Sequence, residues 1–330
     1  IMYNIAIISG DGIGKEVMDA CEYLLDKLDL ELSFKYGEAG FDCFNKNGTT
    51  LPEETIKIAK NSDATLFGAS TSTPGQPSPI INLRKELNVY ANIRPIKSYK
   101  GANSLRDDID FVIVRENTEG LYSQIEYGDE NKMIAERIIT HKASERISKA
   151  AFNICKKRGQ NKVTCVHKSN VLKKTDGVFK ESFYKVAKEY PQITAEDFYV
   201  DAMSMYLITQ PQNFEVIVAS NLFGDILSDQ SAGLVGGLGL APSGNIGDTN
   251  GLFEPVHGSA PDIAGKNIAN PCSMILTASM MLDYLGEWEV SNNINKAVEK
   301  VISDGKIKTP DFGGDASTME LTKAIVKELI

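Results

Sequence analysis

An apolar run that leads into two spaced acids reads Phe214-Glu215-Val216-Ile217-Val218-Ala219-Ser220-Asn221-Leu222-Phe223-Gly224-Asp225-Ile226-Leu227-Ser228-Asp229. The apolar part is typical of a buried strand. The chain is predicted to turn at Gly224 into a helix, which places the carboxylates of Asp225 and Asp229 one turn apart on the same face. Ligands of open α/β sheets bind beyond the carboxyl ends of the strands, so we expect a ligand site at this junction.

The two acids are candidate metal ligands. Carboxylates this close repel each other unless a cation lies between them. Mg²⁺ and Mn²⁺ are natural candidates because they prefer carboxylate and water oxygens. Taken alone, an acid pair with this spacing is more typical of a solvated helix face, and its place after a strand is what favours a metal site. Asp201, which follows the strand-like Phe198-Tyr199-Val200, is a third candidate carboxylate.

Composition narrows the class of protein. The chain has 330 residues, enough for two domains and a sizeable core. Its formal net charge of −9 disfavours nucleic acid and anionic membranes as partners. The five cysteines are scattered and lack C-x-x-C spacing, which predicts a reducing, cytoplasmic location without a disulfide framework or zinc site. We expect neither a signal peptide nor a membrane span, because no apolar run reaches about 18 residues.

A glycine-rich turn follows the first predicted strand, which runs from Tyr3 to Ile8. The turn reads Gly10-Asp11-Gly12-Ile13-Gly14 and continues with Lys15 and Glu16, where a dinucleotide fingerprint would need its third glycine. The pattern therefore favours a tight strand–helix turn near a ligand over a standard Rossmann site. A plain dinucleotide-binding module remains the alternative.

Several cationic residues lie near the ends of predicted elements. Arg84 and Arg94, taken singly, are typical surface charges, whereas Arg115 ends a predicted strand. Together the three could bind a polycarboxylate, because guanidinium groups pair bidentately with carboxylates. Lys168 follows the predicted strand from Val163 to His167. It is either a surface lysine or a proton acceptor with a lowered pKa.

The segment from Phe253 to Pro271 is a long irregular loop rich in small residues. Such loops are usually functional, and small residues allow a ligand to approach the backbone. Asp262 could accept hydrogen bonds from ribose hydroxyls and would repel a 2′-phosphate.

Together these motifs resemble the isocitrate/isopropylmalate dehydrogenase family of metal-dependent β-decarboxylating dehydrogenases, and most of all its archaeal homoisocitrate and 3-isopropylmalate type. The resemblance covers essentially the whole chain. It is carried by Gly10–Gly14, Leu83-Arg84, Tyr90–Pro95, Val114–Tyr122, His167–Leu172, Asp201–Met203, Asn221–Pro242 and Glu254–Pro271. The last two segments are highly specific for the family.

The resemblance implies an α/β, isopropylmalate-dehydrogenase-like two-domain fold that is not a Rossmann fold, with the active site in the interdomain cleft. The large domain would comprise residues 1–97 and 237–330, and the small, dimerising domain residues 98–236. A homodimer or tetramer with shared active sites is expected.

The resemblance also implies a role for each site residue. Tyr122 would protonate the enol, and Lys168 of the neighbouring subunit would handle the proton of the substrate hydroxyl. The substrate would be bound by Ser78, Ile80, Ile81, Arg84, Arg94, Arg115 and Asn170. Mg²⁺ or Mn²⁺ would be held by Asp225 and Asp229 with Asp201 of the partner subunit. The adenosine part of NAD would be bound by His257, Gly258, Ser259, Ala260, Asp262, Ile263 and Asn270.

The implied reaction is the NAD- and metal-dependent oxidative decarboxylation of a 3-substituted malate. The segment Pro77-Ser78-Pro79-Ile80-Ile81 would contact the variable substituent and favours homoisocitrate or a longer homologue first. 3-Isopropylmalate follows, because Ile80 and Ile81 suit an apolar group. Isocitrate comes third, because isocitrate enzymes carry an asparagine where Ile80 stands. A regulatory subunit is the non-enzyme alternative, disfavoured by the complete set of site residues.

Overall fold

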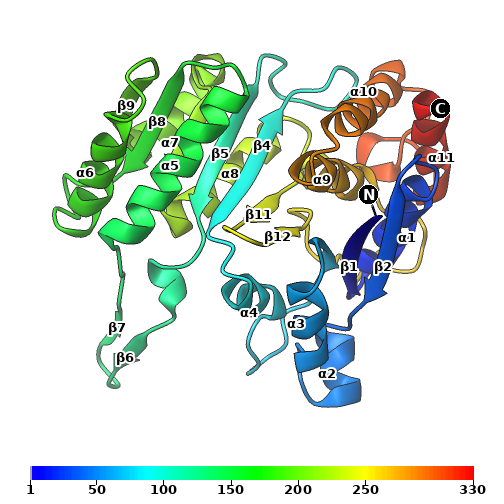
Figure 1. Cartoon of the computed structure of the whole chain (residues 1–330), viewed down its shortest axis with the longest axis horizontal. Coiled ribbons are helices and arrows are strands. Elements are labelled where there is room, and N and C mark those ends of the chain that lie inside the picture. The colour runs from blue at the N-terminus through cyan, green and yellow to red at the C-terminus, as the bar shows by residue number, and fades with distance from the viewer. Residues whose placement is uncertain (1) are drawn as a thin grey trace. The chain divides into compact units, whose positions relative to one another are not determined.

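Two units make up the described part of the chain, residues 2–330 of this computed structural model (Figure 1). Unit 1 contains the residues up to Val89 together with Tyr99–Asp107 and Val235–Ile330. Unit 2 contains Tyr90–Ser98 and Asp108–Leu234. Helices and strands are mixed in both, which confirms the predicted α/β class.

The unit boundaries differ from the predicted boundary at 97/98. Tyr90–Ser98 belongs to unit 2, because its strand β4 (Ala91–Lys97) pairs along its whole length with β5 (Asp110–Glu116). Tyr99–Asp107 returns to unit 1. Strand pairing between distant residues therefore decides to which unit a segment belongs. For this reason one boundary at 97/98 cannot describe how the two units divide the chain.

Unit 1 is built from strands that pair mainly in parallel. Its elements are β1 (Met2–Gly10), α1 (Ile13–Leu25), β2 (Glu31–Tyr36), α2 (Phe41–Asn47), α3 (Glu53–Lys60), β3 (Ala64–Ala69), α4 (Pro79–Glu86), β11 (Gly244–Ile246), β12 (Gly251–Phe253), α9 (Cys272–Tyr284), α10 (Trp288–Asp304) and α11 (Thr318–Leu329). The strand order is β2-β1-β3-β12-β11, and only β11 runs antiparallel to its neighbour β12.

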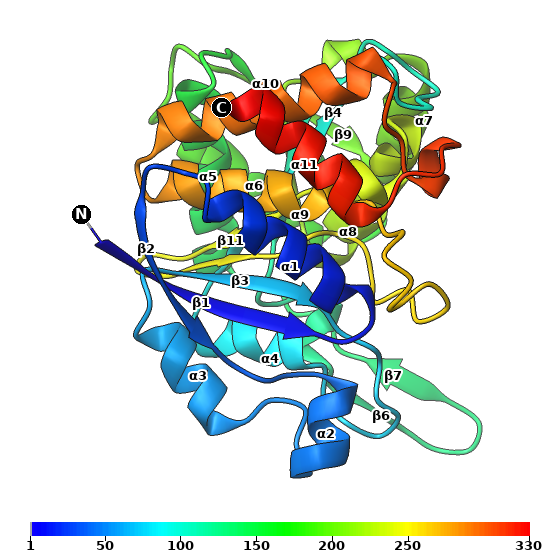
Figure 2. The same ribbon diagram turned by 90° about the vertical axis from the view of Figure 1, so that its right-hand side faces the viewer.

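Helices cover both faces of this part of the sheet. Figure 2 shows α1, α9 and α11 on one side of β1 and β3, and α3 and α4 on the other. Alternation along β1 explains the two layers, because consecutive side chains of a strand point to opposite faces. Ile7 packs with Val17 and Leu24 of α1, whereas Ile8 packs with Leu83 of α4.

Unit 2 is a second layered arrangement with a projecting hairpin. Its elements are β4, β5, β6 (Glu126–Gly128), β7 (Met133–Ala135), α5 (His141–Lys157), β8 (Lys162–His167), α6 (Thr175–Ala187), β9 (Thr194–Tyr199), α7 (Val200–Thr209), β10 (Val216–Ala219) and α8 (Asn221–Leu234). The strand order is β4-β5-β10-β8-β9, with α5 and α6 on one face and α7 and α8 on the other (Figure 1). β6 and β7 form a separate antiparallel pair. None of the helices in residues 2–330 is both long and apolar enough to cross a membrane.

The carboxyl ends of β5, β8 and β10 lie at one edge of unit 2. These strands are parallel, and the register places Ala219 of β10 opposite Arg115 of β5 on one side and Val166 of β8 on the other. The antiparallel β4 brings Asn92 opposite Arg115. The strand ends therefore place Arg115, Lys168 and the start of α8 along the same edge, where ligands of such sheets bind.

Helix α8 begins at Asn221, earlier than the predicted turn at Gly224. Gly224 lies inside the first turn, where a Cβ would be 2.8 Å from both Cβ and Cγ of Arg115. The glycine is therefore needed because α8 passes close to the Arg115 side chain, and not because the chain turns there.

Replacing Gly224 by alanine should lower the free energy of unfolding by about 1–3 kcal/mol, because the added methyl group overlaps the buried Arg115 side chain. Gly233→Ala on the same helix is the matched control. Apart from its chain neighbours and the backbone of its own helix, no atom of residues 2–330 lies within 4 Å of its added Cβ, so the better helix propensity should raise the free energy of unfolding by about 0.5–1 kcal/mol. Urea denaturation followed by circular dichroism measures both values. Equal effects at the two positions would contradict the steric explanation.

Candidate active site

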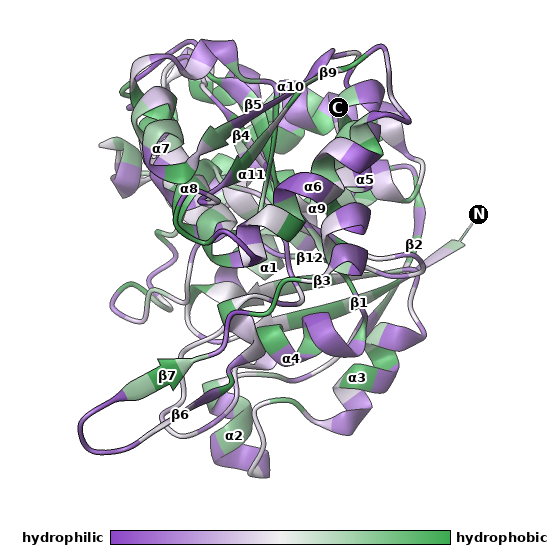
Figure 3. Ribbon diagram, turned by 90° about the vertical axis from the view of Figure 1, so that its left-hand side faces the viewer, coloured by the Kyte–Doolittle hydropathy of each residue, from purple (hydrophilic) through white to green (hydrophobic). Residues whose placement is uncertain are grey.

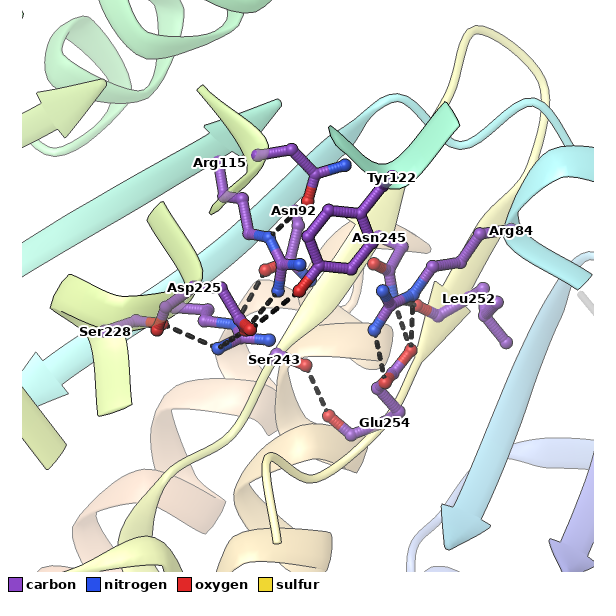
Figure 4. A network of polar contacts seen from close by, with 12 residues as sticks. Arg84, Asn92, Arg115, Tyr122, Asp225, Ser228, Ser243, Asn245, Leu252 and Glu254 are labelled. Carbon is purple, nitrogen blue, oxygen red and sulfur yellow. Dashed lines mark hydrogen bonds and ion pairs between the residues drawn. The ribbon is translucent and has the colours of Figure 1, made fainter. Parts of the chain in front are cut away.

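Two buried arginines converge on one carboxylate in unit 2 (Figure 4). Nη1 of Arg115 donates to Oδ1 of Asp225 at 2.6 Å, and Nη1 of Arg94 lies 3.3 Å from the same oxygen. Nη1 of Arg94 is also 3.3 Å from Oδ1 of Asp229. One guanidinium group can bridge both acids only if they share a helix face, so the structure places Asp225 and Asp229 as their spacing predicts.

Neutral side chains orient the two guanidinium groups. Nε of Arg94 donates to Oδ1 of Asn92 at 2.7 Å, and its Nη1 donates to the hydroxyl of Ser228 at 2.6 Å. Nε of Arg115 donates to Oδ1 of Asn221 at 2.9 Å. These three partners were not predicted. Asn92 could have been found, because it lies two residues before Arg94 on one strand and therefore on the same face.

Tyr122 joins this group from the short helical turn Leu121–Ser123. Its hydroxyl donates to Oδ2 of Asp225 at 2.8 Å, and the guanidinium group of Arg115 lies 5.0 Å from the centre of its ring. Burial raises the pKa of Tyr122, and the neighbouring Asp225 raises it further while Arg115 opposes the shift. The phenol is therefore protonated at neutral pH and can serve as a proton donor.

The two acids of α8 form a donor set that suits a hard divalent cation. Burial raises the pKa of Asp229, Arg94 opposes the shift, and the charge of Asp225 adds to it. A cation bound between the carboxylates would relieve this repulsion, and carboxylate oxygens are preferred ligands of Mg²⁺ and Mn²⁺. Within residues 2–330, no cluster of three or more His, Cys, Asp or Glu side chains is placed to hold a metal. Asp201 therefore does not join Asp225 and Asp229 inside one chain.

Lys168 and Asp201 form a separate polar pair in unit 2. Lys168 follows β8, and Asp201 lies in the first turn of α7. Nζ of Lys168 donates to Oδ1 of Asp201 at 2.6 Å, and this hydrogen bond lowers the pKa of Asp201. Asn170 lies exposed in the turn after Lys168. The structure thus brings together Lys168 and Asp201, the residues predicted to be supplied jointly to a partner's site.

In unit 1, Arg84 is held by an acid that was not among the predicted site residues. Nη2 of Arg84 donates to Oε1 of Glu254 at 2.7 Å, and its Nε lies 3.3 Å from Oε2 (Figure 4). Oε2 also accepts from the side-chain amide of Asn245 at 2.7 Å. The hydroxyl of Ser243 donates to the backbone carbonyl of Glu254 at 2.6 Å. Glu254 directly follows β12, and this place after a strand end could have identified it as a candidate site residue.

The predicted substrate-specificity residues lie at the start of α4. Ser78 is the residue before the helix, and Pro79 occupies its first position. Ile80 packs against the core beside Leu83, whereas Ile81 is half-buried and lies one turn before Arg84. Of the two isoleucines, Ile80 therefore has a structural role, and Ile81 is the better placed to contact a ligand near Arg84.

The predicted cofactor loop between β12 and α9 is fastened to the glycine-rich turn. The backbone amide of Ile13 donates to the carbonyl of Ser259 at 2.8 Å. A Cβ on Gly12 would lie 2.1 Å from that carbonyl oxygen, and Gly12 has a φ of 55°. Glu16 accepts from the amides of Gly265 at 2.9 Å and Ala269 at 3.2 Å. The turn therefore serves to anchor this loop, as well as to join β1 to α1.

Three of the predicted cofactor residues retain groups that could bind a ligand. Nδ1 of His257 donates to the carbonyl of Gly258 at 2.9 Å, because a carbonyl oxygen can only accept. Its Nε2 is buried and has no hydrogen-bond partner among residues 2–330, and burial lowers the pKa of His257. Asp262 and Gly258 are exposed, and in the described part of the chain only the immediate neighbours of Gly258 would lie within 4 Å of a Cβ added to it.

The other predicted cofactor side chains are engaged within the protein. The hydroxyl of Ser259 lies 2.7 Å from that of Thr71. The side-chain amide of Asn270 donates to Asp311 at 3.0 Å, and its oxygen accepts from the amide of Cys272 at 2.9 Å. The side chains of Ala260 and Ile263 pack against the core of unit 1. These four residues shape the loop, and a ligand would meet mainly their backbone.

Known proteins are similar to this chain over nearly its whole length. A family model for isocitrate/isopropylmalate dehydrogenases matches residues 4–326. The sequence is 57% identical over 333 residues to the 3-isopropylmalate/3-methylmalate dehydrogenase of Methanocaldococcus jannaschii, with 99% of each chain covered. It is 49% identical over 341 residues to the homoisocitrate dehydrogenase of the same organism, covering 98% of this chain and 97% of that one.

Among solved structures, the isocitrate dehydrogenase of Methylococcus capsulatus is similar, with a TM-score of 0.95, 43% identity and 99% of each chain covered. This likeness confirms the predicted family fold. The chain belongs to the isocitrate/isopropylmalate dehydrogenase family and is a β-decarboxylating dehydrogenase.

Proposed function

We propose that the enzyme carries out the NAD- and divalent-metal-dependent oxidative decarboxylation of a 3-substituted malate whose substituent is apolar, as in 3-isopropylmalate. The observation that carries this proposal is the convergence of Arg94, Arg115 and Tyr122 on Asp225, beside Asp229. Two guanidinium groups suit a dicarboxylate, a buried phenol suits a proton donor, and paired carboxylates suit a divalent cation.

The proposed substrate order reverses the order predicted from sequence, which placed homoisocitrate first. Segment 77–81 contains no lysine or arginine to pair with the additional carboxylate of homoisocitrate. Ile81 offers an apolar surface one turn before Arg84. The relative at 57% identity is named for 3-isopropylmalate and 3-methylmalate, which have apolar substituents. The hydroxyl of Ser78 supports homoisocitrate as the second candidate, because it could donate to a carboxylate.

The chain's own residues bind the substrate and move its protons. When bound, the metal supplies a Lewis acid and NAD an oxidant. Arg84, Arg94 and Arg115 hold the carboxylates of the malate part, and Lys168 accepts the proton of its hydroxyl group. After CO₂ has left, Tyr122 delivers a proton to the enol carbon, and its raised pKa keeps that proton available at neutral pH.

The residues also fit the two absent groups. Asp225 and Asp229 would hold the metal together with Asp201 of a second subunit. The buried Nε2 of His257 can accept a hydrogen bond from an amino group such as that of adenine. Asp262 can accept from ribose hydroxyls, and its charge would repel the 2′-phosphate of NADP.

A homodimer with shared sites is part of the proposal. Helices α7 and α8 pack together, with the hydroxyl of Ser204 donating to the side chain of Gln230 at 2.8 Å. The exposed hydrophobic residues on these helices include Met205, Ile208 and Ile226, and both ribbons carry hydrophobic colouring in Figure 3. Ile226 directly follows Asp225, so a second copy covering this surface would lie beside the proposed metal ligands.

The substrate proposal predicts a ranking of specificity constants. In an assay of NADH absorbance with Mg²⁺, kcat/KM should be highest for 3-isopropylmalate, lower for homoisocitrate, and lowest for isocitrate and malate. Each methylene group missing from an apolar pocket costs roughly 1–3 kcal/mol, and the additional carboxylate of homoisocitrate or isocitrate must also lose water, so steps of at least about 10-fold are expected. A higher kcat/KM for homoisocitrate would restore the order predicted from sequence, and turnover with none of the four would overturn the proposed function.

Glu254→Gln should weaken both the fold and the binding of substrate. The Arg84–Glu254 pair is only 10% and 11% exposed, so losing one charge should lower the free energy of unfolding by about 3 kcal/mol and misplace a carboxylate-binding group. KM for the malate should rise, whereas KM for NAD should not. The control is Glu86→Gln, whose partner Lys60 forms an ion pair 46% exposed on both sides, and its cost should be roughly 0–1 kcal/mol.

Shared sites predict complementation between two inactive variants. Lys168→Met and Asp225→Asn should each abolish turnover as homodimers. Refolding an equal mixture should restore about a quarter of the wild-type activity, because half of the dimers are mixed and each carries one intact site. The same mixture without refolding is the control. Failure to recover activity in confirmed mixed dimers would mean that Lys168 and Asp225 act within one chain.

A further inference from the structure

Lys168 extends beyond the last hydrogen-bonded residue of β8, so the strand ladder does not fix its backbone. Its side chain reaches Asp201, which is 67% exposed. An ion pair with so exposed a partner contributes little to holding a flexible side chain in place. The backbone carbonyl of Lys168 accepts from the amides of Val171 at 3.0 Å and Leu172 at 2.8 Å, and the amides on both sides of its Cα are held as well.

The amide of Lys168 itself is held by a buried acid. Its N–H donates to Oδ2 of Asp176 at 2.6 Å, and Asp176 is only 1% exposed. The other carboxylate oxygen of Asp176 accepts from Nη1 of Arg137. Arg137 also donates to the hydroxyls of Thr175 at 3.0 Å and Ser220 at 3.2 Å. The Asp176 carboxylate, which accepts from the Lys168 amide, is therefore held in place by Arg137, and Arg137 in turn by Thr175 and Ser220.

The amide that follows Lys168 is held by a buried histidine. The N–H of Ser169 lies 3.1 Å from Nδ1 of His167, and His167 is 1% exposed. Because an amide N–H can only donate, Nδ1 must be the unprotonated nitrogen. The ring proton is therefore on Nε2, which donates to Oδ2 of Asp197 at 2.7 Å.

Asp197 is suited to fix this tautomer. Lys180 lies 2.9 Å from its Oδ2, and the hydroxyl of Tyr184 donates to its Oδ1. Burial alone would raise the pKa of Asp197, but the hydrogen bonds from Tyr184, His167 and Lys180 lower it to about 2. Asp197 is therefore ionised at neutral pH and accepts a hydrogen bond from the Nε2–H group, which leaves Nδ1 unprotonated and able to accept from Ser169.

We propose that His167 and Asp176 are positioning residues that fix the backbone on both sides of Lys168 and thereby set the location of its amino group for proton transfer. This inference rests on the proposed role of Lys168. Asp197 sets the tautomer of His167, and this tautomer affects turnover although the histidine does not contact the substrate.

Two substitutions at His167 separate this role from a merely structural one. His167→Asn retains an acceptor near the place of Nδ1 and loses the group that bonds Asp197. His167→Gln retains a donor near the place of Nε2 and loses the acceptor for Ser169. Both remove the buried ring, so the loss of packing is matched.

Turnover is the first readout. Relative to His167→Asn, His167→Gln should lower kcat on the order of 100-fold, because a displacement of about 1 Å costs that much, while KM for the malate and NAD stays within about 3-fold. Hydrogen exchange of the Ser169 amide, followed by mass spectrometry, is the second readout and needs no activity. Protection should persist in His167→Asn and disappear in His167→Gln.

Equal kcat values for the two variants, or loss of protection in both, would overturn the proposal. If neither variant folds, Asp176→Asn tests the other amide. Its single side-chain carbonyl cannot serve both Lys168 and Arg137, so Lys168 protection and kcat should fall together, and an unchanged kcat would overturn the proposal. A wild-type enzyme that turns over none of the four malates refutes the proposed function instead, while the exchange results still report on the hydrogen bonds.

Discussion

The carboxylate of Asp225 is the group on which the described site of unit 2 depends. It accepts from Arg115 and Tyr122 and lies beside Arg94. Two buried guanidinium groups without such a partner would be strongly destabilising. Two features of the fold accompany this convergence: β4 runs antiparallel to β5, which brings Arg94 to α8, and the glycine at 224 lets α8 pass over Arg115.

The same interaction prepares the site for an anionic ligand. In the structure, Asp225 and Asp229 balance the arginines that we propose bind the substrate. A divalent cation between those acids would compete with the guanidinium groups for the carboxylate oxygens, which would make the arginines available to a dicarboxylate. The proposed metal and substrate would therefore favour each other's binding through charges that lie within hydrogen-bonding distance, and no long-range change of shape is needed.

The sequence predicted the parts of the site that lie next to one another in the chain. Spacing alone placed Asp225 and Asp229 on one helix face, and the residues after predicted strands located Arg115 and Lys168. The start of α8 at Asn221, the unit to which β4 belongs and the partners Glu254 and Asp176 were missed. Each of these depends on a contact between residues distant in sequence, and local periodicity carries no information about such contacts.

The two polar groups of unit 2 are held in place by different means, and this difference matters for their chemistry. Arg94 and Arg115 are 5% and 1% exposed and are fixed through their side chains, by Asn92, Ser228 and Asn221. The Lys168 side chain is 24% exposed, and its ion-pair partner Asp201 is 67% exposed, so it is held less firmly than the two arginines. Its backbone is held more firmly, by the hydrogen bonds that the Lys168 and Ser169 amides donate to Asp176 and His167 and by those that its carbonyl accepts from Val171 and Leu172. If Lys168 serves a partner's site, as we propose, its amino group would exchange Asp201 for the substrate, and the backbone hydrogen bonds would keep its starting position the same.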